Sequence, residues 1–84
     1  MRPYEVFIHE KALAAAPKSG TAAREVMAFI RGLAQNPDTA GDFSERDESD
    51  RTVQVKIIGR YAVTFWTDHP VCEVKVTHIK PADK

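Results

Sequence analysis

The stretch RTVQVKIIGRYAVTFW, residues 51–66, decides the fold of this chain. Apolar residues alternate with other residues on both sides of Gly59-Arg60, and such alternation is typical of β-strands. Gly59-Arg60 itself is short enough to be a hairpin turn. A third alternating run, VCEVKVTHI at residues 71–79, follows the short break Asp68-His69-Pro70. The pattern predicts a three-stranded antiparallel meander.

The first part of the chain predicts one further strand and two helices. YEVFIH, residues 4–9, alternates as a strand does, and the helix-forming residues after it stop at Pro17 and Gly20. Thr21 is placed to cap a second helix, because a threonine oxygen accepts hydrogen bonds from free N–H groups of the first turn. Apolar residues recur at spacings of three and four through residues 21–35, where a proline then ends the helix.

The segment Asp38–Asp50 holds six acidic residues and one basic residue, Arg46, and has no clear periodicity. We expect an acidic, solvated loop there, with a short edge strand around residues 43–46. The order β-α-α-β-β-β predicts a single α+β domain over residues 1–84, with both helices packed on one face of an antiparallel sheet.

Strand alternation sorts the side chains of the sheet onto two faces. The apolar set is expected to meet the helices and comprises Tyr4, Val6, Ile8, Val53, Val55, Ile57, Tyr61, Val63, Phe65, Val74 and Val76. The opposite face is expected to carry Gln54, Lys56, Ile58, Arg60, Ala62, Thr64, Trp66, Glu73, Lys75 and Thr77.

This second face is a candidate RNA-binding surface. Cations can bind a phosphate backbone, and an aromatic ring beside them can stack a base. The candidate RNA-binding residues are therefore Lys56, Arg60, Trp66 and Lys75. The alternative is an ordinary solvated face, because antiparallel sheets often leave one face in water and such a face carries lysines in any case.

The composition narrows the class of protein. The chain has 84 residues, 43% of them hydrophobic, and its 12 basic side chains balance 12 acidic ones. Basic residues exceed acidic ones outside the acidic segment, so overall neutrality does not exclude an RNA partner. Cys72 is the only cysteine, which excludes an intrachain disulfide and favours a reducing cytoplasm. We recognise no secretory signal and no membrane-spanning stretch.

Other chemical motifs are scarce. His9, His69 and His78 have no metal-ligand spacing. We expect His69 in a solvated turn and His78 on the helix-facing side, as a partly buried residue rather than a general base. In the alternating run, Cys72 falls on the same side as the residues expected in the core. We therefore expect a buried, unreactive thiol.

Read from end to end, the chain resembles toxins of the RelE/ParE superfamily, the toxic partners in bacterial type II toxin–antitoxin pairs. The resemblance covers nearly the whole chain, and the order of its loose motifs makes it specific. The matching stretches are YEVFIHEKALAAAPKS, REVMAFIRGLAQNP, Gly41-Asp42, GRYAVTFW and VKVTHIKPADK.

The resemblance implies the RelE-like fold and a cytoplasmic protein neutralised by a cognate antitoxin, with Val26, Ile30 and Leu33 as the residues that bind it. It also implies a link to plasmid stabilisation and a homodimer or a toxin–antitoxin hetero-oligomer. The ribonuclease branch of the family inhibits translation by cleaving messenger RNA on the ribosome without a metal or other cofactor. In this reaction the 2′-hydroxyl of the RNA attacks the neighbouring phosphate. The attack needs cations near the phosphate, a group that accepts a proton and a group that donates one.

The chain departs from the family pattern at positions that matter for this chemistry. In the family, an arginine that meets the phosphate follows the tyrosine of the GxY strand, whereas Ala62 stands at that position here. A second expected arginine aligns with Ala82, and the tail lacks the family's terminal tyrosine. Catalysis would therefore depend on Lys56, Arg60 and Lys80 in a new geometry, and we expect a poor ribonuclease.

Three hypotheses follow from the resemblance and these departures. The chain is a ribosome-dependent mRNA endonuclease, or a non-nuclease toxin that acts on DNA gyrase as the other branch of the family does. The third hypothesis is a binding module that keeps the antitoxin groove and has lost its chemistry. Cleavage of mRNA and growth arrest distinguish the three.

Overall fold

The computed structural model describes residues 3–82. Its elements are β1 (Glu5–Ile8), α1 (Glu10–Ala15), α2 (Gly20–Gly32), β2 (Phe43–Arg46), β3 (Thr52–Ile58), β4 (Tyr61–Asp68), the 3₁₀ helix η1 (His69–Val71) and β5 (Glu73–Pro81). The strands form a five-stranded sheet in the order β1-β5-β4-β3-β2. Strand β1 is parallel to β5, and the other neighbours are antiparallel. The predicted α+β class, the meander and the short edge strand are confirmed.

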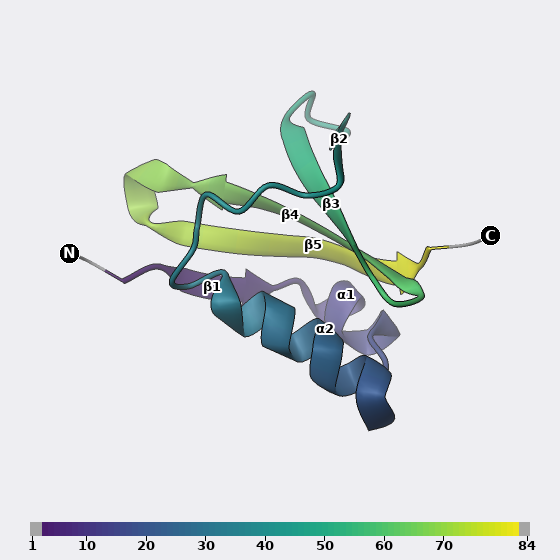
Figure 1. Cartoon of the computed structure of the whole chain (residues 1–84). Helices are drawn as coiled ribbons and strands as arrows, with labels where there is room; N and C mark the ends of the chain where they lie inside the picture. Colours follow the sequence, from purple (N-terminus) through teal and green to yellow (C-terminus); the bar gives the residue numbers. More distant parts are fainter. Residues whose placement is uncertain (1–2, 83–84) are drawn as a thin grey trace.

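Both helices lie on the same side of the sheet (Figure 1). The core between them and the sheet is built from Ala12, Ala16, Val26, Ile30, Leu33, Val63, Phe65, Val74, Val76 and Ile79. The helices carry the chain from β1 at one edge of the sheet to β2 at the other, and the following strands bring it back to β1. Strand β5 then pairs in parallel with β1, a pairing that the sequence pattern did not reveal. Within residues 3–82, neither α1 nor α2 is long and apolar enough to cross a membrane.

Strand β3 presents its side chains to the faces opposite to those predicted. The two-residue turn at Gly59-Arg60 pairs Ile58 with Tyr61, and Tyr61 packs on the helix-side core. Paired residues share a face, and a shift of one residue moves every side chain of a strand to the other face. Val53, Val55 and Ile57 therefore lie on the face away from the helices, which we call the open face, and Lys56 lies on the helix side. The face prediction for β3 was wrong.

Strand β5 contains an irregularity that corrects a second prediction. Thr64 pairs with His78 and Phe65 pairs with Val76, so Thr77 is an extra residue on β5. Such a bulge shifts the alternation of the residues that follow it. As a result Ile79 enters the core, and His78 is exposed on the open face instead of facing the helices.

Cys72 also differs from its predicted state. It is partly exposed, just before β5 begins, and its backbone is left-handed with φ 57°. Strand alternation placed Cys72 in the core only because residue 72 was taken as part of the strand. The neighbouring His69 lies in the turn and is exposed, as predicted.

Gly41 lies where the acidic segment passes close to β3. A Cβ atom at this position would meet the backbone oxygen of Val55 at 2.5 Å. We expect Gly41→Ala to lower the free energy of unfolding by about 1–3 kcal/mol, because the backbone must shift to relieve the overlap. Urea denaturation measures this loss. Gly32→Ala is the matched control, since nothing lies within 4 Å of the added atom. Equal stability of the two variants would contradict the close packing.

Candidate functional site

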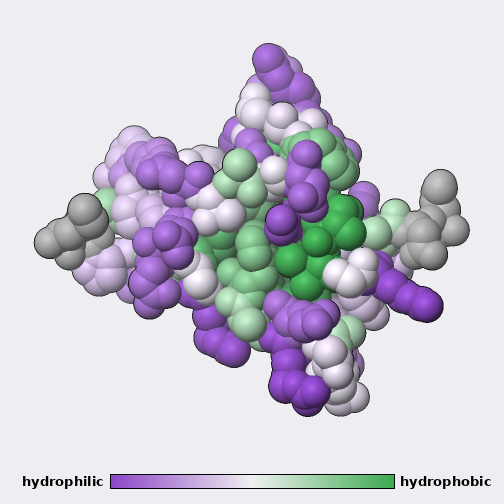
Figure 2. Space-filling model, viewed as in Figure 1, coloured by the Kyte–Doolittle hydropathy of each residue, from purple (hydrophilic) through white to green (hydrophobic). Residues whose placement is uncertain are grey.

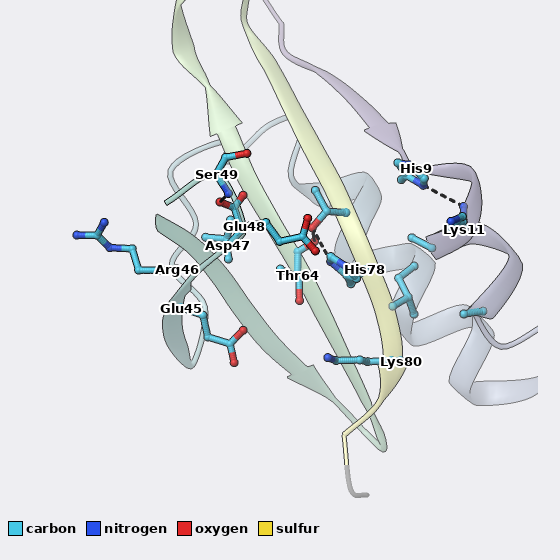
Figure 3. A pocket seen from close by; sticks show the side chains of 15 residues that line it. His9, Lys11, Glu45, Arg46, Asp47, Glu48, Ser49, Thr64, His78 and Lys80 are labelled. Carbon is cyan, nitrogen blue, oxygen red and sulfur yellow. Dashed lines mark hydrogen bonds between the residues drawn. The ribbon is translucent and has the colours of Figure 1, made fainter. Parts of the chain in front are cut away.

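A groove of about 700 Å³ runs across the open face of the sheet. The loop between β2 and β3 forms one wall, and β5 with the start of α1 forms the other (Figure 3). Its lining residues are His9, Lys11, Ala12, Ala15, Glu45, Arg46, Asp47, Glu48, Ser49, Val53, Thr64, Thr77, His78, Ile79 and Lys80. The two walls differ in charge, and each is positioned by the local backbone.

The wall formed by β5 and α1 carries basic and imidazole side chains. His9 ends β1 and caps α1, where its Nδ1 accepts a hydrogen bond from the backbone N–H of Lys11 at 3.1 Å. The bulge at Thr77 turns His78 toward the open face, and Lys80 follows two residues later, paired with Ala62. We call His9, Lys11, His78 and Lys80 the basic wall.

The opposite wall carries carboxylates. Asp47 orders the loop, because its Oδ1 accepts hydrogen bonds from the backbone N–H groups of Ser49 and Arg51, both at 2.9 Å. Arg46 lines the groove too, and its guanidinium pairs with Asp50 at 2.8 Å; in Figure 3 its side chain extends away from Glu48 and His78. We call Glu45, Asp47 and Glu48 the acidic wall, because all three line the groove. Asp47 is paired with Arg51 at 3.4 Å.

The charged groups of the two walls do not neutralise one another. Within residues 3–82, Lys11, Lys80, Glu45 and Glu48 form no ion pair. A groove with such free charges can accept a ligand that is itself charged or rich in hydrogen-bonding groups. The described residues contain no group of three or more His, Cys, Asp or Glu placed to hold a metal ion.

The three predicted catalytic residues are not brought together. Lys56 lies on the helix side, where its Nζ is 3.4 Å from Asp42 Oδ1. The N–H of Ile57 donates to the other oxygen of Asp42 at 2.7 Å, and this bond, together with Lys56, lowers the pKa of Asp42. Arg60 lies in the turn between β3 and β4, and only Lys80 lines the groove. Lys56 is therefore engaged in an ion pair with Asp42, the residue directly before β2.

Trp66 and Lys75 are neighbours on the open face, as predicted. The Lys75 ammonium lies 5.1 Å from the centre of the Trp66 ring, and the Arg51 guanidinium lies 4.0 Å from it. Lys75 also reaches Asp68 and Glu73, each at 3.5 Å. Trp66 is four residues beyond Ala62 along β4, about 13 Å from the Lys80 end of the sheet at the usual rise of a strand. This pair forms a patch separate from the basic wall.

The predicted antitoxin-binding residues lie inside the protein. Val26, Ile30 and Leu33 are 0%, 2% and 1% exposed, because the apolar stripe of α2 faces the sheet. They offer no surface to a partner in this structure, which corrects that prediction. Apolar side chains that remain partly exposed on the helix side are Met27, Phe29, Ile58 and Tyr61. Figure 2 shows apolar surface gathered between α2 and the β3–β4 hairpin.

A hydrogen-bonded chain at the other end of the sheet has a structural role. The Tyr4 hydroxyl lies 2.7 Å from His69 Nδ1, and His69 Nε2 lies 3.2 Å from Asp38. Burial, followed by the charges of Cys72 and Asp38, raises the pKa of Tyr4. The contacts tie β1 to the β4–β5 connection and to the segment after α2.

Sequence reasoning missed most of the groove. His9, Lys11, Glu45 and Glu48 carried no motif, and His78 was assigned to the wrong face. One usable signal was the two-residue turn, which fixes the register of β3 against β4. The charges of the acidic segment were also visible, but nothing in the sequence placed them opposite β5.

Comparisons with known proteins bear on the fold. No family model matches the chain, and no curated protein matches it. Among solved structures, it is similar to a chain of the archaeal RelE–RelB complex from Pyrococcus horikoshii OT3. The match has a TM-score of 0.75 and 20% sequence identity, and it covers 96% of this chain and 97% of the other. The chain has the RelE-like fold that the sequence resemblance predicted.

Proposed function

We propose that this protein is the toxin of a toxin–antitoxin pair and acts on translation by cleaving messenger RNA on the ribosome. The observation that carries the proposal is the RelE-like fold over 96% of the chain, found in a complex of RelE with RelB. The groove on the open face supplies a place for the RNA. A cytoplasmic location agrees with this role.

The basic wall has the side chains that the chemistry needs. Attack of a 2′-hydroxyl on the adjacent phosphate requires cations near the phosphate and groups that accept and donate a proton. Lys80 and Lys11 are the cations in this proposal, and His9 and His78 transfer the protons. Lys80 is paired with Ala62, the position of the missing family arginine, so it adds charge at nearly the same place. One lysine replaces a bidentate arginine poorly, which supports slow cleavage.

A protein antitoxin is the proposed partner. The surface of this chain that would bind it differs from the one predicted from the sequence. An amphipathic helix laid in an apolar groove is a common mode of recognition. The partly exposed Met27, Phe29 and Ile58 offer such a surface on the helix side, in place of the buried residues of α2. The surface lies on the helix side of the sheet, whereas His78 and Lys80 of the basic wall lie on the open face, so antitoxin binding need not cover these two residues.

Induced expression in a bacterial host tests the proposal. We expect growth arrest with mRNA cleaved within translated regions, and relief of the arrest when the adjacent small gene is co-expressed. Primer extension on host messages detects the cuts, and an uninduced culture is the control. Arrest without RNA cleavage would replace the proposal with inhibition of gyrase. No arrest at all would indicate a module that binds an antitoxin and has no toxic activity.

A further inference from the structure

The groove on the open face is electrically polar across its width. Lys11 and Lys80 stand on the β5 side, and Glu45 and Glu48 stand on the loop side. In Figure 3 the Lys80 side chain extends from β5 across the sheet, and Glu48 lies over the sheet near Thr64 and His78. A polyanion can approach the first wall and is repelled by the second.

The floor of the groove carries a hydroxyl group that a polar ligand can reach. Thr64 is only 7% exposed and is the buried polar residue among those described. Its side chain lines the groove, and its hydroxyl forms no hydrogen bond with any residue in the described range 3–82. No side-chain nitrogen or oxygen in the described range is both buried and unpaired, so the Thr64 hydroxyl is open to the groove, where it can hydrogen-bond to a ligand or to water.

Single-stranded RNA has the matching polarity. Its phosphates lie along one side, and its unpaired base edges are free on the other. Phosphates against Lys11 and Lys80 would place base edges toward Glu45 and Glu48. A carboxylate accepts a hydrogen bond from the exocyclic amino group of cytosine. Uracil has a carbonyl oxygen in that position, which a carboxylate repels.

We propose that the acidic wall reads the base, so that the groove prefers single-stranded RNA with cytosine over the same RNA with uracil at the bound position. This inference rests on the proposed function and adds a specificity to it. Glu45 and Glu48 are the specificity-determining residues, and the Thr64 hydroxyl contacts the strand from the floor. The acidic loop then selects among strands that the basic wall attracts.

Equilibrium binding of short 2′-O-methyl oligonucleotides tests the proposal, because these probes lack the hydroxyl needed for cleavage. Fluorescence anisotropy at low salt should show oligocytidylate bound about tenfold more tightly than oligouridylate. Glutamine both accepts and donates hydrogen bonds. Glu45→Gln with Glu48→Gln should therefore tighten oligouridylate binding and bring the ratio of affinities close to one. Glu10→Gln, on α1 outside the groove, should leave the ratio unchanged.

A second variant separates reading of the base from binding of the strand. Thr64→Val keeps the shape of the side chain and should weaken both oligonucleotides by a similar factor of about 2–10. Equal binding of the two oligonucleotides by the unmodified protein, or a cytosine preference that survives in the double glutamine variant, would overturn the inference. Absence of binding to either would also overturn it, whereas the proposed function is judged separately by mRNA cleavage on ribosomes.

Discussion

Replacing Ala62 with arginine should increase mRNA cleavage by about 100-fold or more. Ala62 is paired with Lys80 on the open face, so an arginine there would add a planar cation beside the ammonium of Lys80. Each preorganised donor of this kind contributes about 100–1000-fold to the rate of a reaction that builds negative charge. The rate on programmed ribosomes measures the gain.

Two controls keep this result interpretable. Ala62 is only 6% exposed, so any larger side chain has to find room among its neighbours. Ala62→Met has similar length and no charge, and it should cleave no faster than the unmodified protein. A thermal unfolding curve shows whether each variant is folded. A folded arginine variant without faster cleavage would indicate that the open face near Lys80 does not bind the scissile phosphate.

Truncating Phe65 to alanine should remove about 3–5 kcal/mol of stability, which is more than half of what a domain of this size typically has. Phe65 is 1% exposed at the centre of the helix-side core, and its ring meets the edge of Phe29 at a centroid distance of 5.6 Å. Loss of a buried phenylalanine costs about this much, and a domain of this size has only about 5–8 kcal/mol to lose.

Phe43→Ala provides the comparison for that experiment. Phe43 is 48% exposed on edge strand β2, so its truncation should cost well under half as much. Urea denaturation followed by circular dichroism gives both values. Similar losses for Phe43→Ala and Phe65→Ala would contradict the division of the sheet into a helix-covered face and an open face.

Periodicity predicted the elements well because it is a local property. The alternation in β1, β4 and most of β5, and the apolar stripe of α2, follow from burial on one side of each element. It was harder to predict which face of the sheet the side chains of one strand share with those of the next. For β3 it depended on the pairing of Ile58 with Tyr61 across the turn, and for β5 on one extra residue, Thr77. Each of these features moves side chains to the other face without changing the local pattern.

The candidate site was predicted less well, because it depends on contacts between distant segments. Lys80 was identified from the sequence and lines the groove, whereas Lys56 is paired with Asp42 on the other side of the sheet. The apolar stripe of α2 was correctly identified, but the sheet covers it, so the same residues cannot also form a surface for a partner. Sequence alone does not show which of two neighbours an apolar stripe will meet.

Cleavage of messenger RNA on programmed ribosomes by purified protein tests the central claim most directly. We expect slow cleavage by the unmodified protein, at least about tenfold slower cleavage by Lys80→Ala, and an unchanged rate for Lys56→Ala, whose side chain lies on the opposite face. Gel analysis of end-labelled message over time gives the three rates. Cleavage that is unaffected by Lys80→Ala but lost in Lys56→Ala would contradict the assignment of the open-face groove as the site of reaction.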